Sequence, residues 1–121
     1  MVLRWLAEAP DLPGSARDAL ADTGNVVYVS AATIWEIAIE RSIAKLEIPE
    51  SYAAEIAALG FRELPVTWEH ARRTDSLPLI HRDPFDRLLI AQAQIESLTL
   101  VTTDEIIGRY AVPVLPERTN R

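Results

Sequence analysis

The chain has 121 residues, of which 49% are hydrophobic and 25% charged, a composition typical of one globular domain with its own core. It contains no cysteine, which excludes disulfides and thiolate metal sites and fits the reducing cytoplasm in which we expect it. No apolar stretch has the length of a signal peptide or a membrane helix, so no membrane association is expected. The net charge of −6 argues against a general nucleic-acid-binding surface.

The hydrophobic pattern predicts strands and helices that alternate along the chain. In order, we expect a strand at 26–30, helices at 31–44 and 49–59, a strand at 61–66, helices at 67–75 and 83–97, a strand at 98–102, a short helix at 104–109 and a strand at 112–115. Gly60 lies just past the end of one helix, and Pro65 favours a sheet edge for its strand. This order predicts an α/β fold with a mostly parallel sheet, in which ligands bind beyond the carboxyl ends of the strands.

Glu36 is a carboxylate in a nearly continuous apolar stretch of its predicted helix. Its neighbours Ile34, Trp35 and Ile37 favour burial, and a buried carboxylate must be paired, protonated or bound to a cation. The alternative is a surface position on a narrow polar stripe that Glu36 shares with Glu40.

Two aspartates lie where the helix predicted at 83–97 begins. Asp83 is suited to cap it, because Pro84 follows at the first helical position and Asp86 faces free backbone N–H groups three residues after the cap. Capping explains Asp83 well. It explains Asp86 only in part, because a carboxylate at this end of the sheet is also placed to hold a metal ion.

Asp104 follows the strand predicted at 98–102, so it leaves the sheet where the fold would place an active site. Capping of the short helix that comes next is the alternative role. With Glu36 and Asp86 it makes three acids at the mouths of successive strand–helix units. Oxygen ligands of this kind suit Mg²⁺ or Mn²⁺, which activates water for phosphodiester hydrolysis and turns an acidic pocket into a phosphate-binding one.

Eleven of the twelve basic residues are arginines, and four of them lie in one short stretch with both histidines. The residues of this stretch are His70, Arg72, Arg73, His81, Arg82 and Arg87. Because the guanidinium group binds phosphate through two donors, the stretch favours phosphate contact; scattered arginines from a GC-rich genome are the alternative. The two histidines are too few and too separated for a zinc site.

Four blocks of the sequence resemble the signature of PIN-domain proteins, and most closely that of VapC toxins. They are SAATIWEIAI at 30–39, KL at 45–46, HRDPFDRLLIAQA at 81–93 and LVTTD at 100–104. The blocks stand in the family's order and span nearly the whole chain, and the third is highly specific. The resemblance implies one PIN-like domain over residues 1–121, a three-layer sandwich with its core at 1–116 and a tail at 117–121.

By position, the resemblance implies that Glu36, Asp86 and Asp104 are catalytic acids that coordinate Mg²⁺ or Mn²⁺. Asp83 would be an accessory acid or cap, and Thr102 would lie beside the metal. The residues implied to contact the RNA substrate or an antitoxin are His81, Arg82, Arg87 and Thr102. The implied function is that of a metal-dependent ribonuclease toxin, commonly a homodimer, that a VapB-type antitoxin holds inactive.

One part of the family pattern is missing. Family members begin with a central strand that ends in an Asp-Thr step, whereas residues 1–6 correspond to the helix after it. We therefore expect the sheet to lack its middle strand and the site to lack one aspartate. A start codon further upstream is the interpretation that we favour, and the alternative is a catalytically impaired relative that acts as an antitoxin- or RNA-binding module. A phosphatase or receiver-like domain is disfavoured, since no predicted strand carries its acidic nucleophile.

Overall fold

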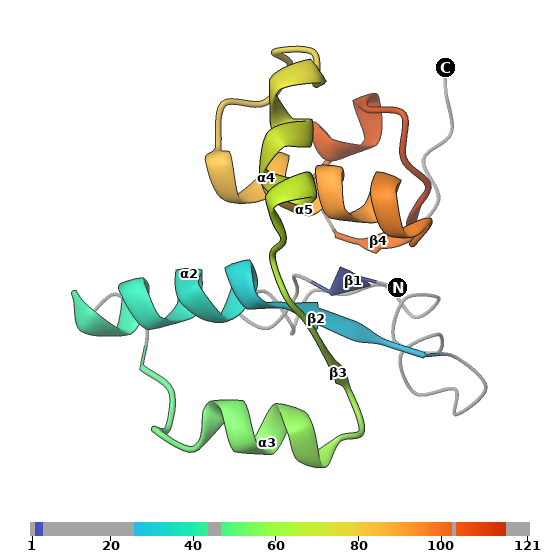
Figure 1. Ribbon diagram of the computed structural model, residues 1–121. Helices are drawn as coiled ribbons and strands as arrows, with labels where there is room; N and C mark the ends of the chain where they lie inside the picture. The colour runs from blue at the N-terminus through green and yellow to red at the C-terminus, as the bar shows by residue number, and fades with distance from the viewer. Residues whose placement is uncertain (1, 4–25, 44–46, 103, 116–121) are drawn as a thin grey trace.

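The computed structural model describes residues 2–3, 26–43, 47–102 and 104–115. In chain order the elements are β1 (Val2–Leu3), β2 (Tyr28–Ser30), α2 (Ala31–Ser42), α3 (Tyr52–Ala58), β3 (Arg62–Leu64), α4 (Trp68–Arg73), the 3₁₀ turn η2 (Thr74–Ser76), α5 (Pro84–Glu96), β4 (Leu100–Val101), the 3₁₀ turn η3 (Ile107–Arg109) and β5 (Val114–Leu115). Helices α4 and α5 lie on one side of the sheet and α3 on the other (Figure 1), which confirms the α/β fold. Within these residues no helix is both long and apolar enough to cross a membrane.

The five strands pair in parallel in the order β3-β2-β1-β4-β5. β1 lies in the middle, where Leu3 pairs with Val29 of β2 and with Val101 of β4. The expectation of a missing middle strand is therefore wrong: Val2–Leu3 is that strand and not part of a helix, and it covers the edges of both neighbours. The expected lack of an aspartate remains in the sequence, which continues after β1 with Arg4.

Local signals explain where the helices begin and end. Ser30 caps α2, its hydroxyl oxygen accepting a hydrogen bond from the N–H of Ala32 at 3.0 Å. Asp83 caps α5 as predicted, with its Oδ1 accepting from the N–H of Phe85 at 2.9 Å. Gly60 follows α3 with a φ of +86°, a conformation that favours glycine. Capping hydrogen bonds within a few residues thus fix where α2 begins after β2 and where α5 begins.

The core lies between α5 and the sheet. Its buried side chains come from β3, α5, β4, β5 and the connections between them, and are Leu64, Leu77, Leu89, Ile90, Ala91, Ala93, Leu100, Ile107, Tyr110 and Val114. Burial of this apolar surface is the main stabilising contribution to the fold. It fixes the position of α5 relative to β4, and with it the positions of the side chains at their adjoining ends.

Buried polar side chains join β2, α4 and α5 inside this core. Ser30 Oγ donates to Gln92 Oε1 at 2.6 Å, and Gln92 Nε2 donates to the carbonyl of Pro65 at 3.2 Å and to His70 Nδ1 at 3.3 Å. His70 Nε2 in turn lies 2.8 Å from Glu96 Oε2. Because these groups satisfy one another, their burial costs little, and the network fixes how the three elements meet.

We expect Ser30→Ala to lower the free energy of unfolding by about 2–4 kcal/mol. The change removes the α2 cap, typically about 0.5–2 kcal/mol, and leaves the buried Gln92 oxygen without this donor, about 1–3 kcal/mol. Urea unfolding followed by circular dichroism measures the effect. Ser76→Ala is the matched control, since its exposed hydroxyl donates to the Arg73 carbonyl at 3.0 Å and should matter by less than about 0.5 kcal/mol. Equal losses in the two variants would contradict the role given to Ser30.

Candidate metal centre

Two aspartates from different elements converge on one histidine. Asp86 lies in the first turn of α5, Asp104 follows β4, and His81 belongs to the loop before α5. His81 Nε2 lies 2.7 Å from Asp86 Oδ2 and 2.9 Å from Asp104 Oδ2. One possible ligand atom from each of the three residues lies within 4.8 Å of the other two. The predicted convergence of the acids after β4 and at the start of α5 is therefore present.

The two carboxylates lie in different local surroundings. Asp86 is 1% exposed and lies at the N-terminus of α5, where the helix dipole stabilises negative charge. Asp104 uses its two oxygens differently: Oδ1 accepts from the N–H of Ile106 at 2.9 Å, and Oδ2 faces His81. The buried Thr102 hydroxyl accepts from the N–H of Asp104 at 3.0 Å. Thr102 thus positions Asp104. The capping role expected for Asp104 is wrong, because η3 begins at Ile107 with Ile106 at its N-cap, and the Asp104 bond to Ile106 closes a turn instead. The site role of Asp104 stays a prediction.

The third predicted acid, Glu36, is half-buried on α2 and is not one of the three clustered residues. Its helix nevertheless runs beside the start of α5. The ring of Trp35 packs edge-on against that of Phe85, with 5.3 Å between the ring centroids. These aromatic residues are the sequence neighbours of Glu36 and Asp86. The assignment of Glu36 as a metal ligand stays a prediction.

Arg87 and Tyr110 fix the loop that carries His81. The Tyr110 hydroxyl oxygen accepts from the backbone N–H groups of Ile80 at 3.1 Å and of His81 at 2.6 Å. The Arg87 guanidinium donates to the carbonyls of Thr74 (2.8 Å), Pro78 (3.0 Å), Leu77 (3.4 Å) and His81 (3.4 Å), and to the Tyr110 hydroxyl (3.4 Å). These bonds give Arg87 a structural task, and its contact with RNA stays a prediction. No local sequence signal marks Tyr110, because its backbone partners lie 29 and 30 residues away.

Arg82 differs from Arg87 in its surroundings. Its side chain is exposed, and it lines a shallow hollow of about 330 Å³ together with Thr74, Leu79, Pro84 and Arg87. The lining includes none of the three clustered residues, although Arg82 directly follows His81 in the chain. The Arg82 side chain is accessible to a ligand, and its contact with phosphate stays a prediction.

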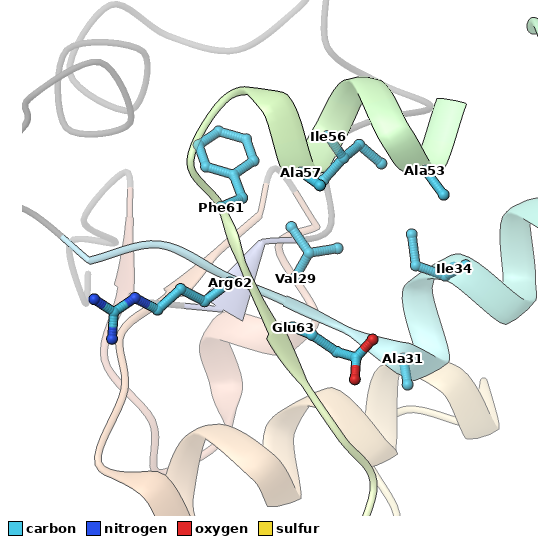
Figure 2. A pocket seen from close by; sticks show the side chains of 9 residues that line it. All are labelled: Val29, Ala31, Ile34, Ala53, Ile56, Ala57, Phe61, Arg62 and Glu63. Atoms are coloured by element: carbon cyan, nitrogen blue, oxygen red, sulfur yellow. The ribbon is translucent and has the colours of Figure 1, made fainter. Parts of the chain in front are cut away.

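A second hollow, of about 240 Å³, is predominantly apolar. Figure 2 shows it between β2, α2, α3 and β3, with Ile34, Ile56 and Phe61 turned toward it and the guanidinium of Arg62 directed away. Its lining includes none of the three clustered residues. Its lining holds one carboxylate, that of Glu63, so the hollow does not bring several acids together as the cluster does.

The sequence matches the PIN domain family over residues 1–113. The chain belongs to the PIN domain family. FitAcB from Neisseria gonorrhoeae is similar in structure, with a TM-score of 0.60 at 23% identity, over 94% of this chain and 96% of that chain. VapBC2 from Rickettsia felis, bound to a DNA fragment from their promoter, gives a TM-score of 0.64 at 15% identity, over 94% and 97%. At these identities the likeness is one of fold, and no curated protein matches the sequence significantly.

PIN domains are generally nucleases and typically bind a divalent metal ion, and the acids of this PIN domain fit such an ion. Asp86 and Asp104 offer carboxylate oxygens, the ligands that Mg²⁺ and Mn²⁺ prefer, from two separate elements at one point. A single histidine does not favour zinc, because protein zinc sites usually contain several nitrogen or sulfur ligands. The cluster is therefore a candidate centre for a hard divalent ion.

We expect Tyr110→Phe to release the loop of His81 while the core ring is kept. Without the phenol oxygen the amides of Ile80 and His81 lose their acceptor, so their native-state hydrogen exchange should become about tenfold faster. NMR exchange rates of these two amides measure the effect. Tyr52→Phe is the control, because the Tyr52 ring contacts the Arg41 guanidinium, 5.4 Å from its centroid, on another part of the domain. Unchanged exchange in Tyr110→Phe would mean that other contacts hold the loop.

Proposed function

We propose that this PIN domain is a divalent-metal-dependent ribonuclease and the toxin component of a toxin–antitoxin pair. The observation that carries the proposal is the convergence of the Asp86 and Asp104 carboxylates on one point, 2.7 Å and 2.9 Å from a shared histidine nitrogen. Membership in a family of nucleases supports hydrolysis of a phosphodiester as the reaction. RNA as the substrate follows from the resemblance to VapC toxins in the sequence.

In this proposal Asp86 and Asp104 hold Mg²⁺ or Mn²⁺, with Glu36 as a third acid. The bound ion would activate a water molecule and neutralise charge on the scissile phosphate. The chain supplies the fixed ligand geometry: the N-terminus of α5 orients Asp86, and Thr102 orients Asp104. A bound cation also makes an acidic site compatible with a phosphate, although the whole chain has a net charge of −6.

Among the residues proposed to contact RNA, Arg82 is the best placed. Its side chain is exposed and follows His81 in the chain, whereas Arg87 donates to the loop and Thr102 is buried against Asp104. An arginine at this position can bind two phosphate oxygens at once. His81 lies between the acids and the loop surface, within reach of a substrate that approaches the metal.

A VapB-type antitoxin and a homodimer are further parts of the proposal, as is a cytoplasmic location. Both structural relatives are toxin–antitoxin complexes, which supports an antitoxin partner. Exposed apolar side chains four residues apart on and just after α2 support a protein interface: Trp35 is 62% exposed, Ile39 37% and Ile43 56%.

Substitution of the acids tests the nuclease directly. With labelled RNA and Mg²⁺ or Mn²⁺, Asp86→Asn and Asp104→Asn should each lower kcat/KM for cleavage by at least about 100-fold, because each removes a metal ligand. Glu36→Gln should show a comparable loss if this acid completes the centre. Asp75→Asn is the matched control, an exposed aspartate in η2 whose loss should leave kcat/KM unchanged.

Two results would decide against parts of the proposal. Metal-dependent cleavage that survives Asp86→Asn would place the active centre elsewhere. RNA or antitoxin binding by the unaltered chain, with no metal-dependent cleavage, would favour the binding-module alternative.

Arg82 can be tested separately in an Asp86→Asn background, in which RNA is bound but not cut. Arg82→Ala should weaken binding of single-stranded RNA and reduce the slope of log K against log salt concentration by about 0.7, the value for one lost phosphate contact. Fluorescence anisotropy over a salt series measures both. Arg62→Ala makes the same charge change at the apolar hollow and should leave the slope unaltered. Equal slopes for Arg82→Ala and its parent would remove Arg82 from the RNA interface.

A further inference from the structure

Trp35 of α2 is a large aromatic side chain that lies mostly in solvent, with 62% of its surface exposed. Its ring contacts that of Phe85 in α5, with 5.3 Å between the centroids and 63° between the planes, an edge-to-face arrangement. Phe85 is half-buried, so it anchors the tryptophan from the inside. The anchored indole is therefore a fixed apolar surface that a planar ligand can cover.

The contact with Phe85 places Trp35 at the end of α5 that carries an acid of the proposed metal centre. Phe85 directly precedes Asp86 in the first turn of this helix, and successive helical residues point about 100° apart. The ring of Phe85 thus lies to one side of the Asp86 carboxylate. Trp35, packed against Phe85, flanks the same end of the helix and leaves the carboxylate uncovered by its ring.

Exposure alone does not distinguish Trp35, because Trp68 in α4 is 91% exposed. The two differ in where they lie along α5. Trp68 is two residues from His70, which contacts Glu96 at the last position of α5. Trp68 therefore lies toward the opposite end of α5 from Asp86. Of these two exposed tryptophans, Trp35 is the one placed beside the acid.

An exposed aromatic ring beside a nuclease centre suits a nucleobase. Every base has a π face that stacks on tryptophan, and single-stranded RNA leaves its bases free to do so. Stacking needs no positive charge, in agreement with a chain of net charge −6. Ile39 and Ile43, further along the same side of α2, have no ring. We infer that Trp35 is a stacking platform for an unpaired base near the scissile phosphate, an inference that rests on the ribonuclease proposed above.

A stacking contact differs from a phosphate contact in its dependence on salt. Neutralising a phosphate releases counterions, so the loss of such a contact changes the slope of log K against log salt concentration. A base stacked on a neutral ring releases none. Loss of Trp35 should therefore weaken RNA binding by the same factor at every salt concentration, whereas loss of Arg82 should change the slope.

The test is the Kd for a short single-stranded RNA of mixed sequence, measured by fluorescence anisotropy with the full chain in the Asp86→Asn background. We expect Trp35→Leu, which keeps an apolar side chain without a ring, to weaken binding about tenfold or more at unchanged salt slope. Trp35→Phe keeps a ring and should recover most of the affinity. Trp68→Leu is the matched control and should leave the Kd unaltered. Equal Kd values for Trp35→Leu and its parent, or for the Leu and Phe variants, would overturn the inference and leave Trp35 to the protein interface.

Tryptophan fluorescence gives a second readout that does not depend on the folding of Trp35→Leu. The chain has three tryptophans, and a base stacked on one of them should quench its emission. Quenching by the RNA should persist in Trp68→Leu and largely disappear in Trp35→Phe. If circular dichroism shows that Trp35→Leu does not fold, this comparison decides. Quenching that is the same in Trp35→Phe and its parent would overturn the inference.

Two further measurements separate the platform from the metal centre. With Asp86 intact, Trp35→Leu should bind Mn²⁺ in isothermal titration calorimetry with the Kd of the unaltered chain. Weaker Mn²⁺ binding together with unchanged RNA binding would make Trp35 a support for the centre and overturn its role as a platform. If the unaltered chain does not cleave RNA with Mn²⁺, the proposed function is wrong and the inference with it. If it cleaves but Trp35→Leu binds RNA as its parent does, only the role of Trp35 is wrong.

Discussion

The contact between one imidazole nitrogen and two carboxylates is the constraint on which the site depends. Asp86 and Asp104 lie close together, and Asp86 is almost fully buried, so the two carboxylates need polar partners. His81 is a partner that they share, at 2.7 Å and 2.9 Å. The acids can meet there because Leu89 of α5 and Leu100 of β4 belong to one core cluster, which fixes the two elements side by side. Apolar packing thus sets the separation of the two carboxylates, and the shared contact with His81 is part of what stabilises them there.

Elements with strong local signals could be predicted from the sequence, and β1 could not. The caps at Asp83 and Gly60 mark helix ends through chemistry that acts within a few residues, and the alternation of strands and helices gives the parallel sheet. β1 has two residues, Val2–Leu3, too few for any periodicity. Its strand character comes from pairing with β2 on one side and β4 on the other, a long-range effect that no local pattern contains. The helix expected at 104–109 is likewise reduced to a turn and η3.

The site shows the same division between local and distant causes. Asp86 and Asp104 could be predicted to converge, because both lie at the carboxyl edge of a parallel sheet. The position of His81 between them could not, because it depends on a loop whose backbone is held by Tyr110, about thirty residues further along the chain. The structural task of Arg87 could not be predicted either. In the sequence Arg87 belongs to an arginine-rich stretch, which predicts phosphate contact. Only the folded loop reveals the carbonyls to which Arg87 donates.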